Sequence, residues 1–148
     1  MVVDNISDFL LNNNYRKKFL SIDFGVKHIG VAISDSNNII SIPFGTYNET
    51  ELLGKINGII TKENIHGVII GKPYHLDGSE SEMNENVIAF SNKIEKVISK
   101  PILLLDERLS SKGYKSRKNQ PDDKIHEKSA CLILDDFLSL YRNSTSEK

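Results

Sequence analysis

The sequence lacks several features that would place it outside ordinary globular proteins. It has a single cysteine, Cys131, which excludes an intrachain disulfide and a metal site built from several cysteines. Its 19 Lys and Arg residues are balanced by 20 Asp and Glu residues, so a net charge of −1 provides no overall positive field. No apolar run approaches membrane-spanning length, and the amino terminus lacks the charge order of a secretory signal. We therefore expect a cytoplasmic protein whose contacts with any polyanion are local.

The chain length favours one main domain. A chain of 148 residues with 39% hydrophobic content can bury a real core but cannot supply two large lobes. The sequence shows neither internal repeats nor a domain-sized change of composition. We expect a helical extension and linker over residues 1–17, a folded domain over 18–142 and a disordered tail over 143–148.

The pattern of apolar residues predicts an α/β fold. Three β-rich runs, at 19–23, 29–34 and 39–44, are separated by short turns and indicate an antiparallel three-strand meander. Short apolar runs at 67–71 and 101–105 predict two further strands, giving a five-stranded mixed sheet. Helical spacing predicts the helices that flank this sheet, over 3–12 with Asp4 as its cap, 48–65, 79–99 and 124–141.

Acidic residues end two of the expected parallel strands. Asp23 ends the first, and Asp106 and Glu107 end the last. The carboxyl ends of such strands meet at one edge of the sheet, where ligands bind. In the last helix His126 lies one turn before Ala130, which belongs to the stripe expected to face the sheet. The sequence therefore predicts that carboxylates and an imidazole converge at this edge.

A divalent cation is the expected occupant of such a cluster. Carboxylates held close together repel each other, and Mg²⁺ or Mn²⁺ relieves this repulsion because these ions prefer oxygen ligands. Two ions bridged by Asp23 would activate a water molecule and stabilise the leaving oxygen during attack on a phosphodiester. The expected reaction is that of a nuclease.

Four segments, in order along the chain, carry a family resemblance. They read IDFGVKHIGVAISD, GVIIGKPYHLDGSES, LLDERLSS and KIHEKSACLILDDFL. Over about residues 18–141 the chain resembles the YqgF family, the Holliday-junction-resolvase-like branch of the RNase H superfamily. The resemblance implies an RNase H-like fold and, for the family, a nuclease that matures the 5′ end of pre-16S ribosomal RNA during ribosome biogenesis. Asp23 and Glu107 match the family's first and second acids.

The sequence departs from the family pattern at two positions. His126, followed by Glu127, stands where the family usually has an aspartate, and Lys72 replaces a leucine. An imidazole binds Mn²⁺ more readily than Mg²⁺, so His126 would alter metal preference, or it would serve as a general acid or base. Glu127 replaces it as ligand only if the helix is rotated. Lys72 either contacts a phosphate or is simply solvated.

Two further assignments stay open at the level of sequence. Asp106 and Glu107 are neighbours on a strand, so only one is expected to reach the metal; Glu107 is our choice, and Asp106 would then pair with a nearby basic group. A basic segment that follows them is the best candidate for contact with a nucleic-acid backbone, and a solvated loop is the alternative. It contains Lys112, Lys115, Arg117 and Lys118.

Three other functions compete with rRNA processing. The Asp-x-Gly turn around Asp23 also suits the phosphate-binding hairpin of sugar kinases and actin-like ATPases, but those proteins need two lobes. A resolvase-like nuclease for branched DNA shares the predicted site. A non-catalytic RNA-binding assembly factor for ribosomal precursor particles would have the same fold with a damaged metal site, as His126 allows.

Overall fold

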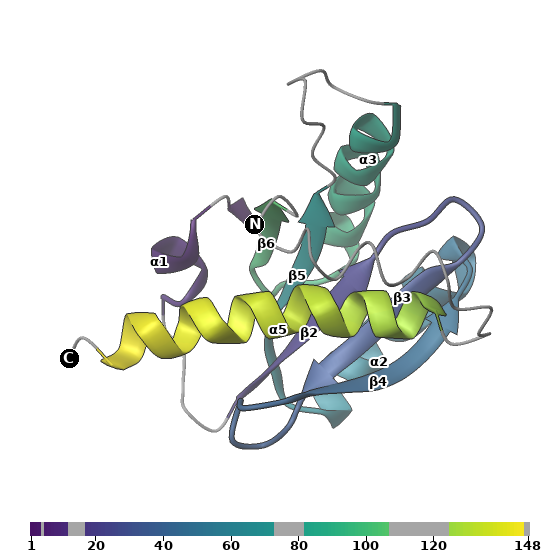
Figure 1. Cartoon of the computed structure of the whole chain (residues 1–148). Helices are drawn as coiled ribbons and strands as arrows, with labels where there is room; N and C mark the ends of the chain where they lie inside the picture. The colour runs from purple at the N-terminus through teal and green to yellow at the C-terminus, as the bar shows by residue number, and fades with distance from the viewer. Residues whose placement is uncertain (4, 12–16, 73–81, 107–124, 147–148) are drawn as a thin grey trace.

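The computed structural model describes residues 1–3, 5–11, 17–72, 82–106 and 125–146 (Figure 1). The strands are Val2–Val3 (β1), Lys18–Asp23 (β2), Ile29–Ser34 (β3), Ser41–Tyr47 (β4), Ile65–Lys72 (β5) and Ile102–Asp106 (β6). The helices are Ile6–Phe9 (α1), Glu49–Lys62 (α2), Glu82–Val97 (α3) and Ile125–Ser146 (α5).

The strands form one mixed sheet in the order β1-β6-β5-β2-β3-β4. Strands β2, β3 and β4 pair in antiparallel fashion, which confirms the predicted meander. Strands β2, β5 and β6 run parallel to one another. The α/β class and the mixed sheet flanked by helices are therefore confirmed.

The predicted strand number of five was wrong, because the described chain has six. The additional strand is β1, whose Val2 and Val3 pair in parallel with Ile102 and Leu103 of β6. A strand of two residues is too short to show the alternation by which strands are recognised in a sequence. Only its pairing with a strand from the other end of the chain defines it.

Helices cover both faces of the sheet. Leu20 and Ile22 of β2 point into a core layer shared with α2 and α3, whereas Phe19 points into a second layer with α5. This division follows from the alternation of side chains along a strand. Figure 1 shows α5 crossing one face, over β2 and β3. Its predicted inward stripe, Ala130, Ile133 and Phe137, is buried there, as expected.

The first helix is shorter than the sequence predicted. It spans four residues rather than residues 3–12, and the side chain of Asn5, not Asp4, caps it by accepting a hydrogen bond from the Asp8 amide. Isolated short helices are marginal in water, so the pairing of β1 and the packing of Phe9 decide its extent. Asp4 and the expected caps of the two later helices, Ser79, Asp122 and Asp123, lie outside the described residues.

An aromatic cluster joins α1 to the sheet. Phe9 is fully buried and contacts Phe19, Phe137 and His66, at ring-centroid distances of 6.0, 5.5 and 5.6 Å. The His66 Nε2 donates a hydrogen bond of 2.7 Å to the Phe9 carbonyl oxygen. His66 is only 5% exposed, and this burial lowers the pKa of its imidazole below the ordinary value. The neutral ring therefore links the amino-terminal segment to β5.

The lowered pKa of His66 predicts how stability depends on pH. Below about pH 6.5 this histidine binds a proton readily in the unfolded chain but less readily in the folded chain. The free energy of unfolding therefore falls as the solution is acidified. Urea unfolding between pH 5 and 8 should show a weaker pH dependence for His66→Phe than for the unchanged protein. An identical dependence would show that other groups account for the effect.

None of the described helices is long and apolar enough to span a membrane.

Candidate active site

Asp23 occupies the carboxyl end of β2 on the face covered by α5. Side chains alternate along the strand, so Asp23 shares this face with Phe19 and Ser21. The Ser21 hydroxyl donates a hydrogen bond of 2.7 Å to the Ala130 carbonyl oxygen, which fixes α5 against β2. Asp23 is partly exposed, as a carboxylate that contacts a ligand must be.

Gly30 brings the start of α5 next to Asp23. It is the cross-strand partner of Asp23 in the pairing of β2 with β3. A Cβ atom at this position would overlap the backbone carbonyl of His126 and lie 2.9 Å from the Glu127 nitrogen. Since only a glycine allows this approach, the first turn of α5 rests directly on the β3 backbone beside Asp23. Asp23 and His126 thus share one face and one edge of the sheet.

A second histidine accompanies His126. The ring of His28, in the turn between β2 and β3, lies 5.1 Å from the His126 ring, centroid to centroid, with 32° between their planes. His126 is partly buried and His28 is exposed. Sequence reasoning missed His28, although its position two residues before Gly30 indicates the same face. Its proximity to His126 depends on where α5 crosses the sheet.

Glu127, the next residue of α5, points away from His126 and toward β4. Its Oε1 accepts a hydrogen bond of 3.3 Å from the Thr46 hydroxyl of β4. Burial, followed by the charge of Glu127, raises the pKa of the Tyr47 phenol. The carboxylate therefore lies against β4 rather than in line with His126. Burial likewise raises the pKa of the Cys131 thiol, which packs beside the core and is not activated as a nucleophile.

Asp106 and Lys72 lie apart from Asp23 and His126. Asp106 alternates with Leu105, which belongs to the core layer under α5, so its side chain belongs to the opposite face from Asp23. Lys72 is its partner in the register of β5 and β6. Strand β5 separates β6 from β2, so Asp106 and Asp23 are also two strands apart.

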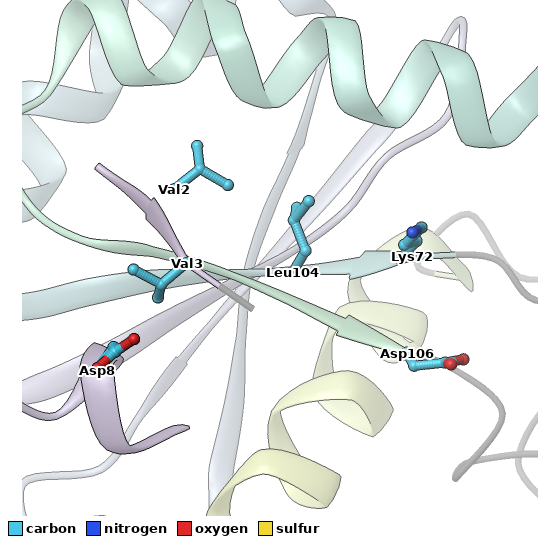
Figure 2. Close-up of a pocket in the computed structure, with 6 residues that line it drawn as sticks. All are labelled: Val2, Val3, Asp8, Lys72, Leu104 and Asp106. Atoms are coloured by element: carbon cyan, nitrogen blue, oxygen red, sulfur yellow. The ribbon is translucent and has the colours of Figure 1, made fainter. Parts of the chain in front are cut away.

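These two residues line a pocket at the outer edge of the sheet. Its volume is about 580 Å³ (Figure 2). Figure 2 shows Val2 and Leu104 projecting toward α3, with Lys72 and Asp106 at the ends of their strands. The lining residues are Val2, Val3, Asp8, Lys72, Leu104 and Asp106. Neither Asp23 nor His126 belongs to this pocket.

The remaining predicted site residues lie outside the part of the chain that the structure describes. They are Glu107, Lys112, Lys115, Arg117 and Lys118. Among the described residues, no group of three or more His, Cys, Asp or Glu side chains is arranged to hold a metal ion. The carboxylate of Asp23 and the nearby imidazoles are donors that suit a divalent ion, but they are only part of a ligand set.

Comparison with known proteins identifies the fold and the protein family. The fold is similar to that of a Thermus thermophilus RuvC solved in complex with a Holliday junction substrate, with a TM-score of 0.55 at 8% identity over 85% of this chain and 96% of that one. This similarity supports an RNase H-like fold. A family model described as RuvX, Holliday junction resolvase, matches residues 17–140.

Curated relatives agree with this match. The "Putative pre-16S rRNA nuclease" of Orientia tsutsugamushi (strain Ikeda) is 36% identical over 158 aligned positions, covering 99% of both chains. The protein of the same name from Pelagibacter ubique (strain HTCC1062) is 39% identical over 73% of this chain and 74% of its own. The chain belongs to the RuvX family, also called YqgF, as its motifs predicted, and is an enzyme of the phosphodiester-hydrolysing nuclease class.

The contact at Gly30 gives a prediction with a matched control. Gly30→Ala should push the first turn of α5 off the sheet and reduce the free energy of unfolding by about 2 kcal/mol, as overpacking does. Gly54→Ala, at an exposed site in α2 with no atom within 4 Å of the new methyl group, should instead stabilise the protein by up to about 1 kcal/mol. Urea unfolding measures both changes. Equal stability of the two variants would contradict the close packing at Gly30.

Proposed function

We propose that this protein is a metal-dependent nuclease that processes the 5′ end of pre-16S ribosomal RNA. The observation that carries the proposal is the contact of α5 with Gly30, which sets His126 beside Asp23 at the carboxyl edge of β2. The shared name of two relatives, one aligned over 99% of this chain and the other over 73%, supports rRNA as the substrate.

The proposed ligands are Asp23, His126 and Glu107. A divalent ion held there would supply an activated water molecule and stabilise the leaving oxygen of the phosphodiester. Asp23 contributes negative charge from a strand end that is fixed on both sides, by β3 and β5. His126 would contribute an imidazole nitrogen donor, and an imidazole is also a side chain that can accept a proton from the attacking water.

Asp23 and Asp106 lie on different faces of the sheet and are therefore expected to have different roles. Since Asp106 belongs to the face opposite Asp23, we propose that it is not a ligand to the same ion. Lys72, its register neighbour, provides a positive charge at the end of β5, where it could contact a phosphate of the substrate. Glu127 is held by Thr46 and orients the helix turn rather than binding the ion.

Branched DNA is the second candidate substrate. The observation in its favour is the match to a family model described as a Holliday junction resolvase. We place it second because the full-length relatives carry the rRNA name.

Asp23→Asn tests the catalytic role. The variant should fold normally but lose a charged ligand, and cleavage of structured RNA with Mn²⁺ or Mg²⁺ should slow at least about a hundredfold, or about 2.7 kcal/mol in activation free energy. The matched control is Asp135→Asn, since Asp135 is an exposed residue of α5 whose Oδ1 accepts a hydrogen bond from the Ser41 hydroxyl of β4, and the asparagine keeps an oxygen for that bond while losing the charge. Turnover by Asp23→Asn at the rate of the control would remove Asp23 from the mechanism.

His126→Asp separates a metal-ligand role from proton transfer. If His126 is a ligand, the aspartate should strengthen Mg²⁺-supported cleavage, because an oxygen donor replaces a nitrogen. If it transfers a proton, a near-neutral group in the pH–rate profile should disappear in this variant. The absence of cleavage by both proteins, with either metal and on RNA and branched DNA, would contradict the proposed metal-dependent reaction.

The basic segment tests nucleic-acid contact. Alanine at Lys115, Arg117 and Lys118 should weaken RNA binding and reduce the slope of log affinity against log salt by about 2, since each phosphate contact contributes about 0.7. Three exposed lysines of the α2 and α3 face provide a control with the same change in charge: Lys55, Lys62 and Lys96. An equal loss in both triple variants would mean that overall charge, not this segment, governs binding.

A further inference from the structure

Two partly buried lysines come together at the edge of the sheet opposite Asp23. Lys17 directly precedes β2, and Lys100 stands two residues before β6. Strands β2, β5 and β6 are parallel, and β5 lies between the other two. Both lysines therefore stand at the amino-terminal edge of these strands, on either side of the start of β5.

Hydrogen bonds to the backbone fix the position of both residues. The Nδ2 of Asn38 donates a hydrogen bond of 2.9 Å to the carbonyl oxygen of Lys17. Pro101, which follows Lys100, accepts a hydrogen bond of 3.0 Å from the Val68 amide of β5. Both lysine side chains therefore start from anchored backbone.

The two side chains meet beside the second residue of β5, His66. The positive charge of Lys17, followed by burial, lowers the pKa of Lys100, and a hydrogen bond between the two side chains acts in the same direction. Burial is the main cause of the lowered pKa of His66, and the charges of both lysines lower it further. Since each lysine acts on the other and on the same imidazole, the three groups form one cluster.

No acidic side chain balances the two lysines within the described part of the chain. Lys18, the next residue, is paired with Glu63 at 2.9 Å, whereas no ion pair of the described residues includes Lys17 or Lys100. Two ammonium groups cannot hydrogen-bond to each other while both are protonated, because an ammonium group has no acceptor. An oxyanion between them would accept a hydrogen bond from each and offset their repulsion.

A phosphate group is the ligand that suits this arrangement. Lysines bind phosphates as point charges, and a phosphate offers several acceptor oxygens. The Nε2 of His66 is already bonded to the Phe9 carbonyl oxygen, so the lysines supply the donors. We propose that Lys17 and Lys100 form a second phosphate-binding site, which holds a backbone phosphate of the RNA substrate away from the bond that is cleaved. This inference rests on the proposed function, because the RNA is the substrate of the proposed reaction.

The separation of the two edges sets the length of RNA that reaches both. Lys17 lies six residues before Asp23 along β2, or about 20 Å at about 3.3 Å per residue. Successive phosphates of one strand are about 3.4 Å apart along a nucleic-acid duplex. A duplex arm must therefore extend by about six base pairs beyond the cleaved bond, and a dinucleotide cannot reach the second site.

Inorganic phosphate tests the site directly. In protein with ¹³C-labelled lysine side chains, an NMR titration should show that phosphate raises the pKa of Lys100, because the added negative charge favours the protonated amine. Lys17→Gln should weaken phosphate binding about tenfold through the loss of a charged donor, and Lys17→Arg should largely preserve it. Lys55→Gln, at an exposed lysine of α2, should bind phosphate like the unchanged protein. A Lys100 resonance that does not respond to phosphate would overturn the site.

RNA binding tests the source of the phosphate. Lys17→Gln combined with Lys100→Gln should reduce the slope of log affinity against log salt by about 1.4 for a long structured RNA, since each phosphate contact contributes about 0.7. The control with the same change of charge is Lys55→Gln combined with Lys93→Gln, at exposed lysines of α2 and α3. A slope equal to that of the control would overturn the RNA contact, even if inorganic phosphate binds to the two lysines.

These outcomes are separate from those that test the proposed function. If the Lys17 and Lys100 double variant binds RNA like the control while Asp23→Asn still abolishes cleavage, the second site is refuted and the nuclease function stands. If the double variant shows the smaller slope but the unchanged protein cleaves no RNA with either metal, the phosphate site is supported and the proposed reaction is contradicted.

Discussion

The contact between the backbone of Gly30 and the first turn of α5 determines the geometry of the candidate site. A side chain larger than hydrogen at this position would overlap the His126 carbonyl, so the helix could not reach the sheet. Because Gly30 pairs with Asp23, the same contact sets the start of the helix beside the acid at the end of β2. Ser21 reinforces it one turn later through its hydrogen bond to Ala130. Helix, acid and imidazoles are therefore positioned by backbone packing rather than by direct attraction between their side chains.

The order of the strands separates two chemical environments at the carboxyl edge. On the face covered by α5 lie Asp23 and the pair of histidines, His28 and His126. Asp106 belongs to the other face and lines a pocket at the β6 edge with Lys72. This separation follows from the side-chain alternation in each strand: Leu105 lies in the layer under α5, so its neighbour Asp106 belongs to the other face, whereas Asp23 shares the α5 face with Phe19. An ion bound at Asp23 and a phosphate contacted by Lys72 would thus occupy neighbouring but distinct positions.

The amino-terminal segment is integrated with the rest of the fold. Val2 and Val3 extend the sheet beyond β6, and Phe9 is buried between the sheet and α5. The hydrogen bond from His66 to the Phe9 carbonyl satisfies a polar group that would otherwise be costly in this apolar layer. By covering part of β6, the segment also forms one wall of the pocket that contains Asp106.

The sequence by itself determined the family, the α/β class and most of the strands and helices. Periodicity identified the meander, the parallel strands and the inward stripe of α5, and the motifs identified the family, because these signals are local. It also indicated that Asp23 ends a strand at a ligand-binding edge. Only the tertiary structure decided that Val2–Val3 forms a sixth strand, that His28 meets His126, and that Asp106 faces away from Asp23. These relations depend on strand order and on where α5 crosses the sheet, and both are set by packing between residues far apart in the chain.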